Sequence, residues 1–593
     1  MTAAPHPLVR KLRRAFELLR EDGLLRFLGR LGYEVRESRL FRSYRRWIAR
    51  YDKLDRAARQ RIRVEVAGLP ERPLVSILLI ASAEQATWLS ATLWSVQGQL
   101  YPAWELCVAA DRALVDDLRR RAKSDPRIRL AADEALTWGD KANAALAVAA
   151  GEFVVPLDAG DLLAEDALYR VAQAMTGADV IFSDEDKLEG RKRCEPWFKT
   201  DWNPALMLSC NAVGRLCAYR RELVQRLGGF RSNFAGAEEH DLVLRCARAS
   251  EAGRIRHIPY VLYHRRGRPA QTLAAATARA VADYLAAQDV KAEVQTTPAG
   301  IQVSYPLPVT PPKVSILIAT TARPEIIASC LSSLFERTSY PNWDVALLVN
   351  QNVRSMPERY RLLDDFARRP NAHVVEYADR PFNYSWVNNY GAAQATGDIL
   401  CFLNDDTEAI TPDWLQQLVA RVSLSQVAAA GAMLYYPDDT IQHAGVVLGL
   451  SGVAGHACHG ARRGSRGYFG RAVLEQDVSC VTAACMAIRA DVFRAHGGFD
   501  ETMPLAYNDV DLCLRLRGAG WRIVWLPTAE LYHHESASFG RHDRGASSTQ
   551  YARDVAVMRE RWGSALAADP YYNPNLSLVH GYRLAFPPRG GAL

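Results

Sequence analysis

The sequence lacks any run of about 20 consecutive apolar residues, the length that a helix needs to cross a bilayer. The first residues, 1–23, also lack the uninterrupted apolar stretch of a secretory leader. We therefore expect neither a membrane-spanning helix nor export. On this pattern the chain is expected to stay in the cytoplasm.

Paired cysteines are missing as well. None of the eleven cysteines forms a CxxC pair or the clustered spacing of a zinc site. Scattered cysteines are typical of reduced thiols that pack as small apolar side chains. The pattern argues against a disulfide scaffold and against a cysteine-ligated zinc domain.

An even distribution of charge is the third absence. Residues 1–72 hold 19 Lys and Arg against 9 Asp and Glu, a net charge of +10, and since the whole chain carries +7, the remainder carries −3. This balance argues against nucleic-acid binding along the whole surface. It favours one basic element with its own partner, such as an anionic membrane.

The basic element is expected to be helical, because Leu12, Phe16 and Leu19 recur at helical spacing and arginines fill the other faces. Such a helix can lie in the membrane interface with its arginines on anionic head groups. It can equally pack on the neighbouring domain with its charged face in solvent. The first alternative predicts a peripheral protein on the inner face of the cytoplasmic membrane.

One segment of the chain occurs twice. The run "VSILLIASAEQATWLSATLWSVQGQLYPAWEL" from Val75 returns as "VSILIATTARPEIIASCLSSLFERTSYPNWDV" from Val314, at a constant offset of 239 positions. A constant offset indicates an internal duplication. In both copies short apolar runs alternate with helical stretches, which predicts an α/β fold with a mostly parallel sheet and helices on both faces.

The expected organisation has five parts. A basic helical segment (1–72) precedes a first domain (73–300), a Pro-rich linker (301–312), a second domain (313–545) and a tail (546–593). The tail is rich in proline and aromatic residues, so we expect it to wrap the last domain rather than to fold alone.

Acidic residues follow a predicted strand in the second copy. Asn404, Asp405 and Asp406 come directly after the run "ILCFL", so their side chains should emerge at the carboxyl edge of the sheet, where ligands bind in parallel α/β folds. Hard oxygen ligands at this edge suit Mg²⁺ or Mn²⁺. The same residues could instead form a turn and a helix cap before "TPDWLQQLV".

Two further constellations follow along the second copy. Asp509 and Asp511 open a predicted helix, where capping accounts for one carboxylate and leaves the other for acid–base chemistry. His533 and His534 follow apolar runs. A lone histidine is usually structural, but an imidazole ligand is reasonable beside a metal-competent acid pair.

In this order the three constellations resemble the inverting family 2 glycosyltransferases with the GT-A fold. The runs "FNYSWVNNYGAAQATGDILCFLNDDTE", "YYPDDTIQHAGVVLGLSGVAGHA" and "GGFDETMPLAYNDVDLCLRLRGAGWRIVWLPTAELYHHES" look like the rhamnosyltransferase-like bacterial enzymes that build O-antigen and other surface polysaccharides. The resemblance covers nearly all of residues 73–545. It implies two tandem, Rossmann-like GT-A domains and sugar transfer from a nucleotide-sugar donor to a growing glycan, which we expect to be lipid-linked.

The resemblance also implies roles for single residues. Asp406, His533 and Asp405 would hold a divalent metal, Mn²⁺ or Mg²⁺, with His534 as the alternative to His533, and Asp509 would deprotonate the acceptor hydroxyl. The implied donor-binding residues are Thr320, Arg323, Asn350, Asn389, Asn404 and Asp405. Asn350 stands where the family usually has an aspartate, and its uncharged amide oxygen could still accept a hydrogen bond from the base.

The first copy departs from this pattern. Aligned with the second copy, it has a glycine at the position of Asp406, so the metal position is empty unless Asp161 reaches in. Glu239 replaces the base Asp509, and its extra methylene group shifts the carboxylate. The first-domain counterparts of the site residues are Asp111, Asp158, Asp161, Glu239 and His264.

The motifs are intact in the second copy and altered in the first, so the second domain is the expected catalyst. One alternative has both domains active, adding two sugars in turn. Another is a non-catalytic, glycan-binding scaffold in polysaccharide assembly. No nucleic-acid partner is expected, and the sugar and the acceptor are not fixed by fold or motif.

Overall fold

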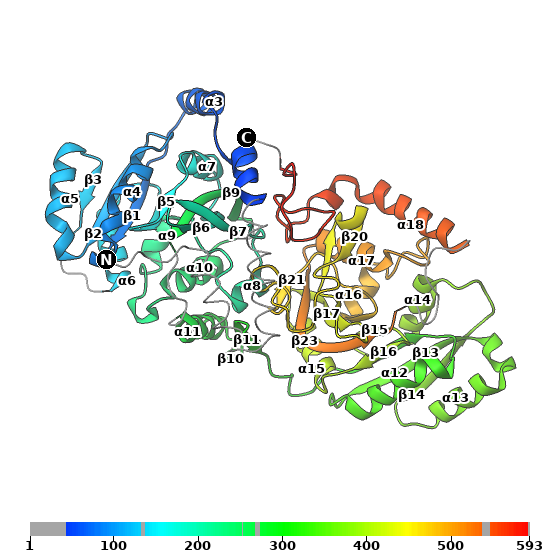
Figure 1. The fold of residues 1–593 in the computed structure, drawn as a ribbon. Coiled ribbons are helices and arrows are strands. Elements are labelled where there is room, and N and C mark those ends of the chain that lie inside the picture. Colours follow the sequence, from blue (N-terminus) through cyan, green and yellow to red (C-terminus); the bar gives the residue numbers. More distant parts are fainter. Residues whose placement is uncertain (1–42, 132–136, 252, 267–272, 536–545, 591–593) are drawn as a thin grey trace, which may run out of the picture.

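The computed structural model describes residues 43–131, 137–251, 253–266, 273–535 and 546–590. The predicted interfacial helix at the start of the chain therefore lies outside the described residues. Figure 1 shows two α/β units, the first coloured blue to green and the second green to orange, with the red tail beside the junction between them.

The first unit is built on a nine-stranded sheet in the order β3-β2-β1-β4-β8-β6-β9-β5, with β7 paired to β6. Its strands are β1 (Val75–Ala81), β2 (Trp104–Ala110), β3 (Ile128–Leu130), β4 (Phe153–Asp158), β5 (Leu162–Leu163), β6 (Val180–Glu189), β7 (Lys192–Trp197), β8 (Cys217–Arg220) and β9 (Ile255–Arg266). Its helices are α3 (Arg56–Ala67), α4 (Ala86–Gln97), α5 (Arg112–Ser124), α6 (Trp138–Ala147), α7 (Ala167–Ala174), α8 (Pro204–Ser209), α9 (Arg221–Arg226), α10 (Glu238–Ala249) and α11 (Leu273–Ala286). β1 is buried along its whole length, as expected of a strand covered on both faces.

The second unit is built on a ten-stranded sheet in the order β14-β13-β12-β15-β22-β17-β23-β16, with β18 on β17 and β21 on β23. Its strands are β12 (Val314–Ala319), β13 (Trp343–Asn350), β14 (Ala372–Tyr377), β15 (Ile399–Leu403), β16 (Thr407–Ala409), β17 (Val427–Tyr435), β18 (Ile441–His443), β21 (Gln476–Asp477), β22 (Cys485–Arg489) and β23 (Arg522–His533). Its helices, with that of the tail, are α12 (Pro324–Arg337), α13 (Pro357–Ala367), α14 (Tyr384–Gln394), α15 (Trp414–Val422), α16 (Ala490–Ala495), α17 (Asn508–Gly518) and α18 (Ala546–Trp562).

The main strand order of the two sheets repeats one topology, and β21 is the additional strand of the second sheet. In each, the first strand of the unit pairs in parallel with both neighbours, and one antiparallel strand, β8 or β22, separates two strands that run the other way. The predicted α/β class with two tandem GT-A-like domains is therefore confirmed. The antiparallel strand makes each sheet mixed rather than wholly parallel.

A short hairpin follows the first domain. β10 (Glu293–Thr296) and β11 (Ile301–Ser304) pair antiparallel. The start of the predicted linker is therefore strand, and its irregular, Pro-rich part begins after β11.

The two domains share a polar seam around Asp477 of β21. Its carboxylate accepts a hydrogen bond from the Ala205 backbone N–H at 2.9 Å and pairs with Arg522 at 2.7 Å. The Asn203 side chain both donates to the Asp477 carbonyl and accepts from its N–H, each at 2.9 Å. Buried groups satisfied in this way stabilise the seam, because separating the domains would leave them unpaired.

The tail contacts both domains, whereas wrapping of the second domain was expected. Asn573 donates to both carboxylate oxygens of Asp184 on β6, each at 3.0 Å. Asp569 accepts from Ser479 and from the Leu448 backbone N–H of the second domain, at 2.7 and 2.8 Å. The tail therefore ties the two domains together.

The structure bears on the cysteines and on membrane-spanning helices within the described residues. All eleven cysteines lie in it, and each is a free thiol. Within the described ranges, no helix combines the length and the apolar character that crossing a membrane requires.

Candidate functional site

The candidate site of the second domain begins where β15 ends. Asn404, Asp405 and Asp406 follow the strand. Asp405 and Asp406 are each only 6% exposed. The Asn404 backbone N–H donates to the Ala484 carbonyl at 3.0 Å, which anchors the turn to the segment before β22. The residue that caps α15 is Asp413, so the acids are not a helix cap.

His533 at the end of β23 lies beside Asp406. Its Nε2 is 3.1 Å from Asp406 Oδ1 and 3.2 Å from Asn404 Nδ2. Its Nδ1 is 2.6 Å from Gln442 Oε1, an oxygen that can only accept. Nδ1 therefore carries a proton, and Nε2, which lies beside the carboxylate, is the ring nitrogen that a metal ion could bind.

The spacing of these two atoms fits a small divalent cation. Two neighbouring ligands of an octahedral ion, each about 2.1 Å from the metal, lie about 3 Å apart, which is the separation of Asp406 Oδ1 and His533 Nε2. Burial raises the pKa of Asp406, but hydrogen bonding to His533, the charge of that imidazole when protonated, and a backbone N–H together lower the pKa below its ordinary value. The carboxylate is thus ready to bind a cation.

Asp405 is hydrogen-bonded to a residue of another strand end. Its Oδ2 accepts a hydrogen bond from Thr320 Oγ1 at 2.7 Å, and Thr320 follows β12. His534 also points elsewhere: its Nε2 lies 3.8 Å from Glu408 Oε2, and only its backbone N–H reaches Asp406, donating to the carbonyl at 2.9 Å. Among the predicted metal residues, the structure brings together Asp406 and His533.

Asp509 lies in the first turn of α17, at the same edge of the sheet. Its Oδ2 accepts from the Ala483 backbone N–H at 3.0 Å and its Oδ1 from that of Val510 at 2.8 Å. Ala483 is next to Ala484, whose carbonyl binds Asn404. Burial raises the pKa of the Asp509 carboxyl, as suits a group that must take up a proton.

Asp511, the other acid of this motif, is structural. Its side chain is fully buried and pairs with Arg515 and Arg561, both at 2.8 Å. The corresponding acid of the first domain, Asp241, pairs with Arg245 in the same way at 2.7 Å. The motif thus separates into one acid for packing and one at the candidate site.

Tyr384, at the start of α14, was not singled out from the sequence. Its hydroxyl donates to the Ala483 carbonyl at 3.2 Å. Burial, together with the charge of Asp509 and to a lesser degree that of Asp405, raises the pKa of Tyr384. Its only signal in the sequence is its place in the run "FNYSWVNN", which resembles the family without marking the tyrosine.

The tail helix α18 holds the turn that carries Asp509. Asp554 accepts from the Leu505 and Ala506 backbone N–H groups at 3.3 and 2.9 Å. The hydroxyls of Tyr507 and Tyr551 are 2.8 Å apart, and Tyr507 has a φ of 59°, in the left-handed region. A non-glycine residue in this conformation needs surrounding support, which α18 supplies.

The predicted base-binding residue, Asn350, ends β13. Its Oδ1 accepts from the Asn352 backbone N–H at 2.9 Å, and its Nδ2 donates to Asp379 Oδ1 at 3.1 Å. The amide oxygen thus already has an internal partner. Asp379 supplies a carboxylate at this position that sequence reading did not identify.

The remaining donor-binding candidates have different surroundings. Arg323 is the N-cap residue of α12. Asn389 joins α14 to the segment before α17: it donates to the Phe499 carbonyl and to Glu501, and accepts from the Phe499 N–H, at 2.8 to 3.0 Å. All polar atoms of the Asn389 amide therefore have partners within the protein.

In the first domain the same positions are paired differently. Asp111 forms an ion pair with Lys141 and accepts from the Ala83 N–H at 2.8 Å. His264 places its Nδ1 2.7 Å from Asp186 Oδ1. Of the other counterparts, Asp158 and Glu239 contact Arg215, and the Tyr263 hydroxyl links Arg215 to Asp161.

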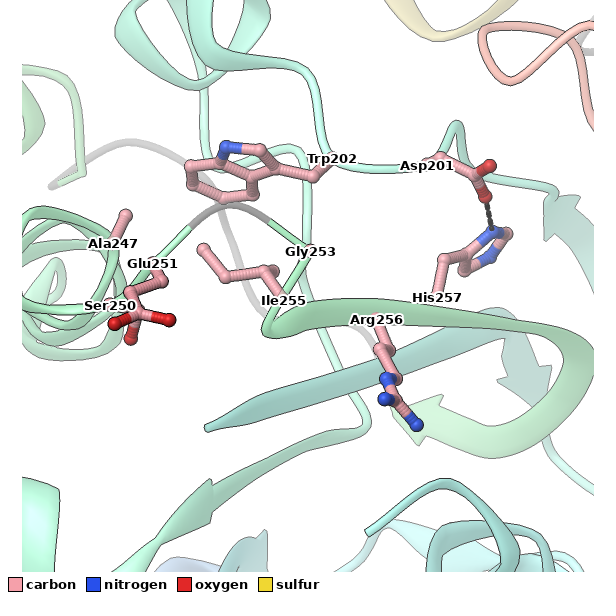
Figure 2. A pocket seen from close by; sticks show the side chains of 9 residues that line it. All are labelled: Asp201, Trp202, Ala247, Ser250, Glu251, Gly253, Ile255, Arg256 and His257. Carbon is pink, nitrogen blue, oxygen red and sulfur yellow. Dashed lines mark hydrogen bonds and ion pairs between the residues drawn. The ribbon is translucent and has the colours of Figure 1, made fainter. Parts of the chain in front are cut away.

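A cavity of about 440 Å³ lies elsewhere in the first domain, lined by residues that include Trp202, Glu251 and His257 (Figure 2). Figure 2 shows His257 directed at Asp201, and the two are 3.1 Å apart. The cavity is at the start of β9. Because β9 runs parallel to β6, this is the amino edge of the sheet, opposite the strand ends that carry the candidate residues.

Comparison with known proteins gives consistent matches. Residues 311–555 match the family described as "Glycosyltransferase like family 2", and residues 76–228 match "Glycosyl transferase family 2". An uncharacterised protein y4gI of Sinorhizobium fredii is 38% identical over 562 residues, which cover 91% of this chain and 61% of that protein. The O-antigen biosynthesis protein RfbC of Myxococcus xanthus is 37% identical over 552 residues, which cover 88% of this chain and 42% of that protein.

A shorter match concerns an N-acetylglucosaminyl-diphospho-decaprenol L-rhamnosyltransferase of Mycobacterium tuberculosis, 42% identical over 67 residues, which are 11% of this chain and 22% of that protein. The chain thus spans only about half the length of the two long relatives. Both domains nevertheless carry the family's sequence and the same sheet topology. The chain belongs to glycosyltransferase family 2, with two copies of the GT-A-like domain in tandem.

Proposed function

We propose that the second domain transfers a sugar, with inversion, from a nucleotide-sugar donor to a growing, lipid-linked surface polysaccharide. The observation that carries the proposal is the Asp406–His533 pair, whose Oδ1 and Nε2 atoms lie 3.1 Å apart at the strand ends. The name of the O-antigen relative and that of the diphospho-decaprenol rhamnosyltransferase support the class of acceptor. We also propose that this work takes place at the cytoplasmic face of the membrane.

Asp406 and His533 would hold a divalent ion, Mn²⁺ or Mg²⁺, through Oδ1 and Nε2. When bound, the ion neutralises charge on the departing diphosphate. With two protein ligands, room remains for phosphate oxygens and water, which is how Mg²⁺ is commonly bound. Gln442 keeps His533 in the tautomer that can act as a ligand.

Asp509 would act as the base. The carboxylate accepts the proton of the acceptor hydroxyl as the oxygen attacks the anomeric carbon, and the bond from that carbon to the diphosphate breaks. A single displacement inverts the configuration. Ala483 and Val510 hold the carboxylate by their N–H groups, so its position is fixed before the substrate arrives.

Asp509→Asn and Asp406→Asn separate these roles. We expect Asp509→Asn to bind donor normally and to transfer sugar about 10²–10⁴-fold more slowly. Asp406→Asn should lose metal-dependent donor binding itself. Donor binding followed by calorimetry, with transfer followed by nucleotide release, would test both; normal turnover in Asp509→Asn would remove this residue from the base role.

The scaffold alternative makes an opposite prediction. A glycan-binding scaffold releases no nucleotide from any sugar donor, with or without Mn²⁺. We expect release from at least one member of a panel of UDP-, GDP- and dTDP-sugars, and we expect a chelator to abolish it. Absence of release across the panel, with a bacterial membrane extract as acceptor source, would favour the scaffold.

A further inference from the structure

The first-domain site contains a cation of its own, Arg215. The Arg215 guanidinium pairs with Asp158 Oδ2 at 3.2 Å and donates from Nε to Glu239 Oε2 at 2.6 Å. Its Nη1 also donates at 3.2 Å to the hydroxyl of Tyr263, and this hydroxyl donates to Asp161 Oδ2 at 2.6 Å. One guanidinium therefore connects all three carboxylates of the site.

Strand register locates these acids relative to the second domain. Leu162 pairs with His264 as Thr407 pairs with His533. Asp161 directly precedes Leu162, so it occupies the position of Asp406, where sequence alignment had placed a glycine. The position is thus acidic, although both Asp161 oxygens are engaged, by Tyr263 and by the Arg266 backbone N–H at 2.8 Å.

Register also identifies the counterpart of Arg215. Arg220 pairs with the first residue of β4, and Arg489 pairs with the first residue of β15. Counting back five positions from each arginine gives Arg215 in the first domain and Ala484 in the second. The second domain thus has a methyl group where the first has a guanidinium.

Two buried side chains, Lys199 and Glu185, bind the backbone of Arg215. Lys199, fully buried, donates to the Arg215 carbonyl at 2.5 Å and pairs with Glu185 at 3.1 Å. Glu185 in turn accepts from the Arg215 N–H at 2.5 Å. The Arg215 side chain itself is 13% exposed. A group buried and bonded in this way is a fixed part of the site rather than a mobile surface arginine.

We propose that Arg215 permanently replaces the divalent ion at the strand ends of the first domain, so that this site takes no metal, the domain transfers no sugar, and the strand-end sites of the two domains hold a single metal centre between them. The charges decide the matter: three carboxylates around one guanidinium are already partly neutralised, and a dication there would meet a buried positive charge at contact distance. The inference rests on the proposed function only in assigning the single metal centre to the second domain.

Binding of Mn²⁺ to the full chain, followed by the electron paramagnetic resonance of the free ion, tests the number of centres. We expect one equivalent per wild-type chain and none in Asp406→Asn. An equivalent that persists in Asp406→Asn and disappears when Asp158→Asn is added would overturn the proposal.

Thermal unfolding tests the role of Arg215 independently of the second domain. Arg215→Met leaves buried carboxylates without their cation, so we expect the midpoint to fall by roughly 5 °C or more, and Mn²⁺ to restore part of the fall. The exposed Arg279→Met is the matched control and should shift little. An Arg215→Met midpoint equal to wild type, with no response to Mn²⁺, would contradict the proposal even if the proposed transferase reaction were correct.

Discussion

Gln442 Oε1 lies 2.6 Å from His533 Nδ1, and this contact decides which ring nitrogen faces Asp406. A second bond, from Gln442 Nε2 to Glu535 at 3.2 Å, fixes the orientation of the amide. The residue that orients His533 comes from β18, a short strand outside the main sheet order that pairs with β17. The metal competence of the site thus depends on a residue about 90 positions away in sequence.

Replacing Gln442 with alanine should weaken Mn²⁺ binding by about 10–100-fold, because the imidazole loses the partner that holds its proton on Nδ1. A Mn²⁺ titration measures the change. Gln417→Ala is the control: this glutamine bonds to Asp413 and Thr528, away from the site, and should leave the titration unaltered. Equal affinities for both variants would show that Gln442 does not orient the ligand.

Amide substitution of the two acids of α17 should affect the free energy of unfolding to very different extents. Asp511→Asn removes the charge that pairs with two arginines in a fully buried position, so we expect a loss of about 2–4 kcal/mol in the free energy of unfolding. Asp509→Asn should cost little stability, since burial already disfavours its carboxylate. Denaturant unfolding of both variants checks this, and the reverse order would refute the division of roles.

The pH dependence of transfer should reflect Asp509. Because burial raises the pKa of this carboxyl, the base is protonated at a higher pH than an ordinary aspartic acid, whose pKa is about 3.9. The rate should therefore fall on the acid side with an apparent pKa above that value. A profile flat to well below pH 4, in a protein still folded, would be inconsistent with this base.

The stability of the chain should also depend on pH through Glu239. Burial raises its pKa to about 7, although Arg215 acts in the other direction. Among the described residues, Glu239 Oε1 has no hydrogen-bond partner, so it can carry the proton while Oε2 accepts from Arg215. The folded state then binds more protons than the unfolded state, whose glutamic acid pKa is about 4.3.

It follows that stability falls as the pH rises from about 4.3 through 7. Glu239→Gln, which cannot titrate, should reduce this slope while keeping an oxygen for Arg215. Thermal midpoints at a series of pH values measure it. An unchanged slope in the variant would mean that Glu239 is charged throughout the range.

The tail helix should matter for the rate. Asp554→Ala removes the acceptor of two backbone N–H groups in the turn before Asp509, so the base loses its fixed position. We expect kcat to drop about tenfold or more with little change in the KM for donor. Asp413→Ala, which touches only α15 and its neighbours, is the control; a change confined to KM would contradict this positioning role.

The duplication, the α/β class and the domain order could be predicted, because apolar strand runs, turns and a constant offset are local signals. The order of the strands within each sheet, with β8 and β22 antiparallel, was not predicted, because it depends on pairings between distant segments. The tail's contact with both domains was missed for the same reason. Asn573 reaches Asp184 across almost 400 positions.

The acids and histidine of the second domain could be proposed from their order, and the structure brings Asp406, Asn404 and His533 into contact. Gln442 and Tyr384 could not be singled out, since nothing local distinguishes a glutamine or tyrosine that points at a site. Arg215 was hidden differently. It lies before an ordinary strand, and only the folded chain brings it to Asp158 of β4 and Glu239 of α10.

One measurement tests the central claim most directly: nucleotide release from the sugar-donor panel, with Mn²⁺, by the full chain carrying either Asp406→Asn or Glu239→Gln. If the second domain is the catalyst, Asp406→Asn should lower the rate of nucleotide release at least about 100-fold. Glu239→Gln should release nucleotide at the wild-type rate. Loss of release in Glu239→Gln, with Asp406→Asn still active, would contradict the account.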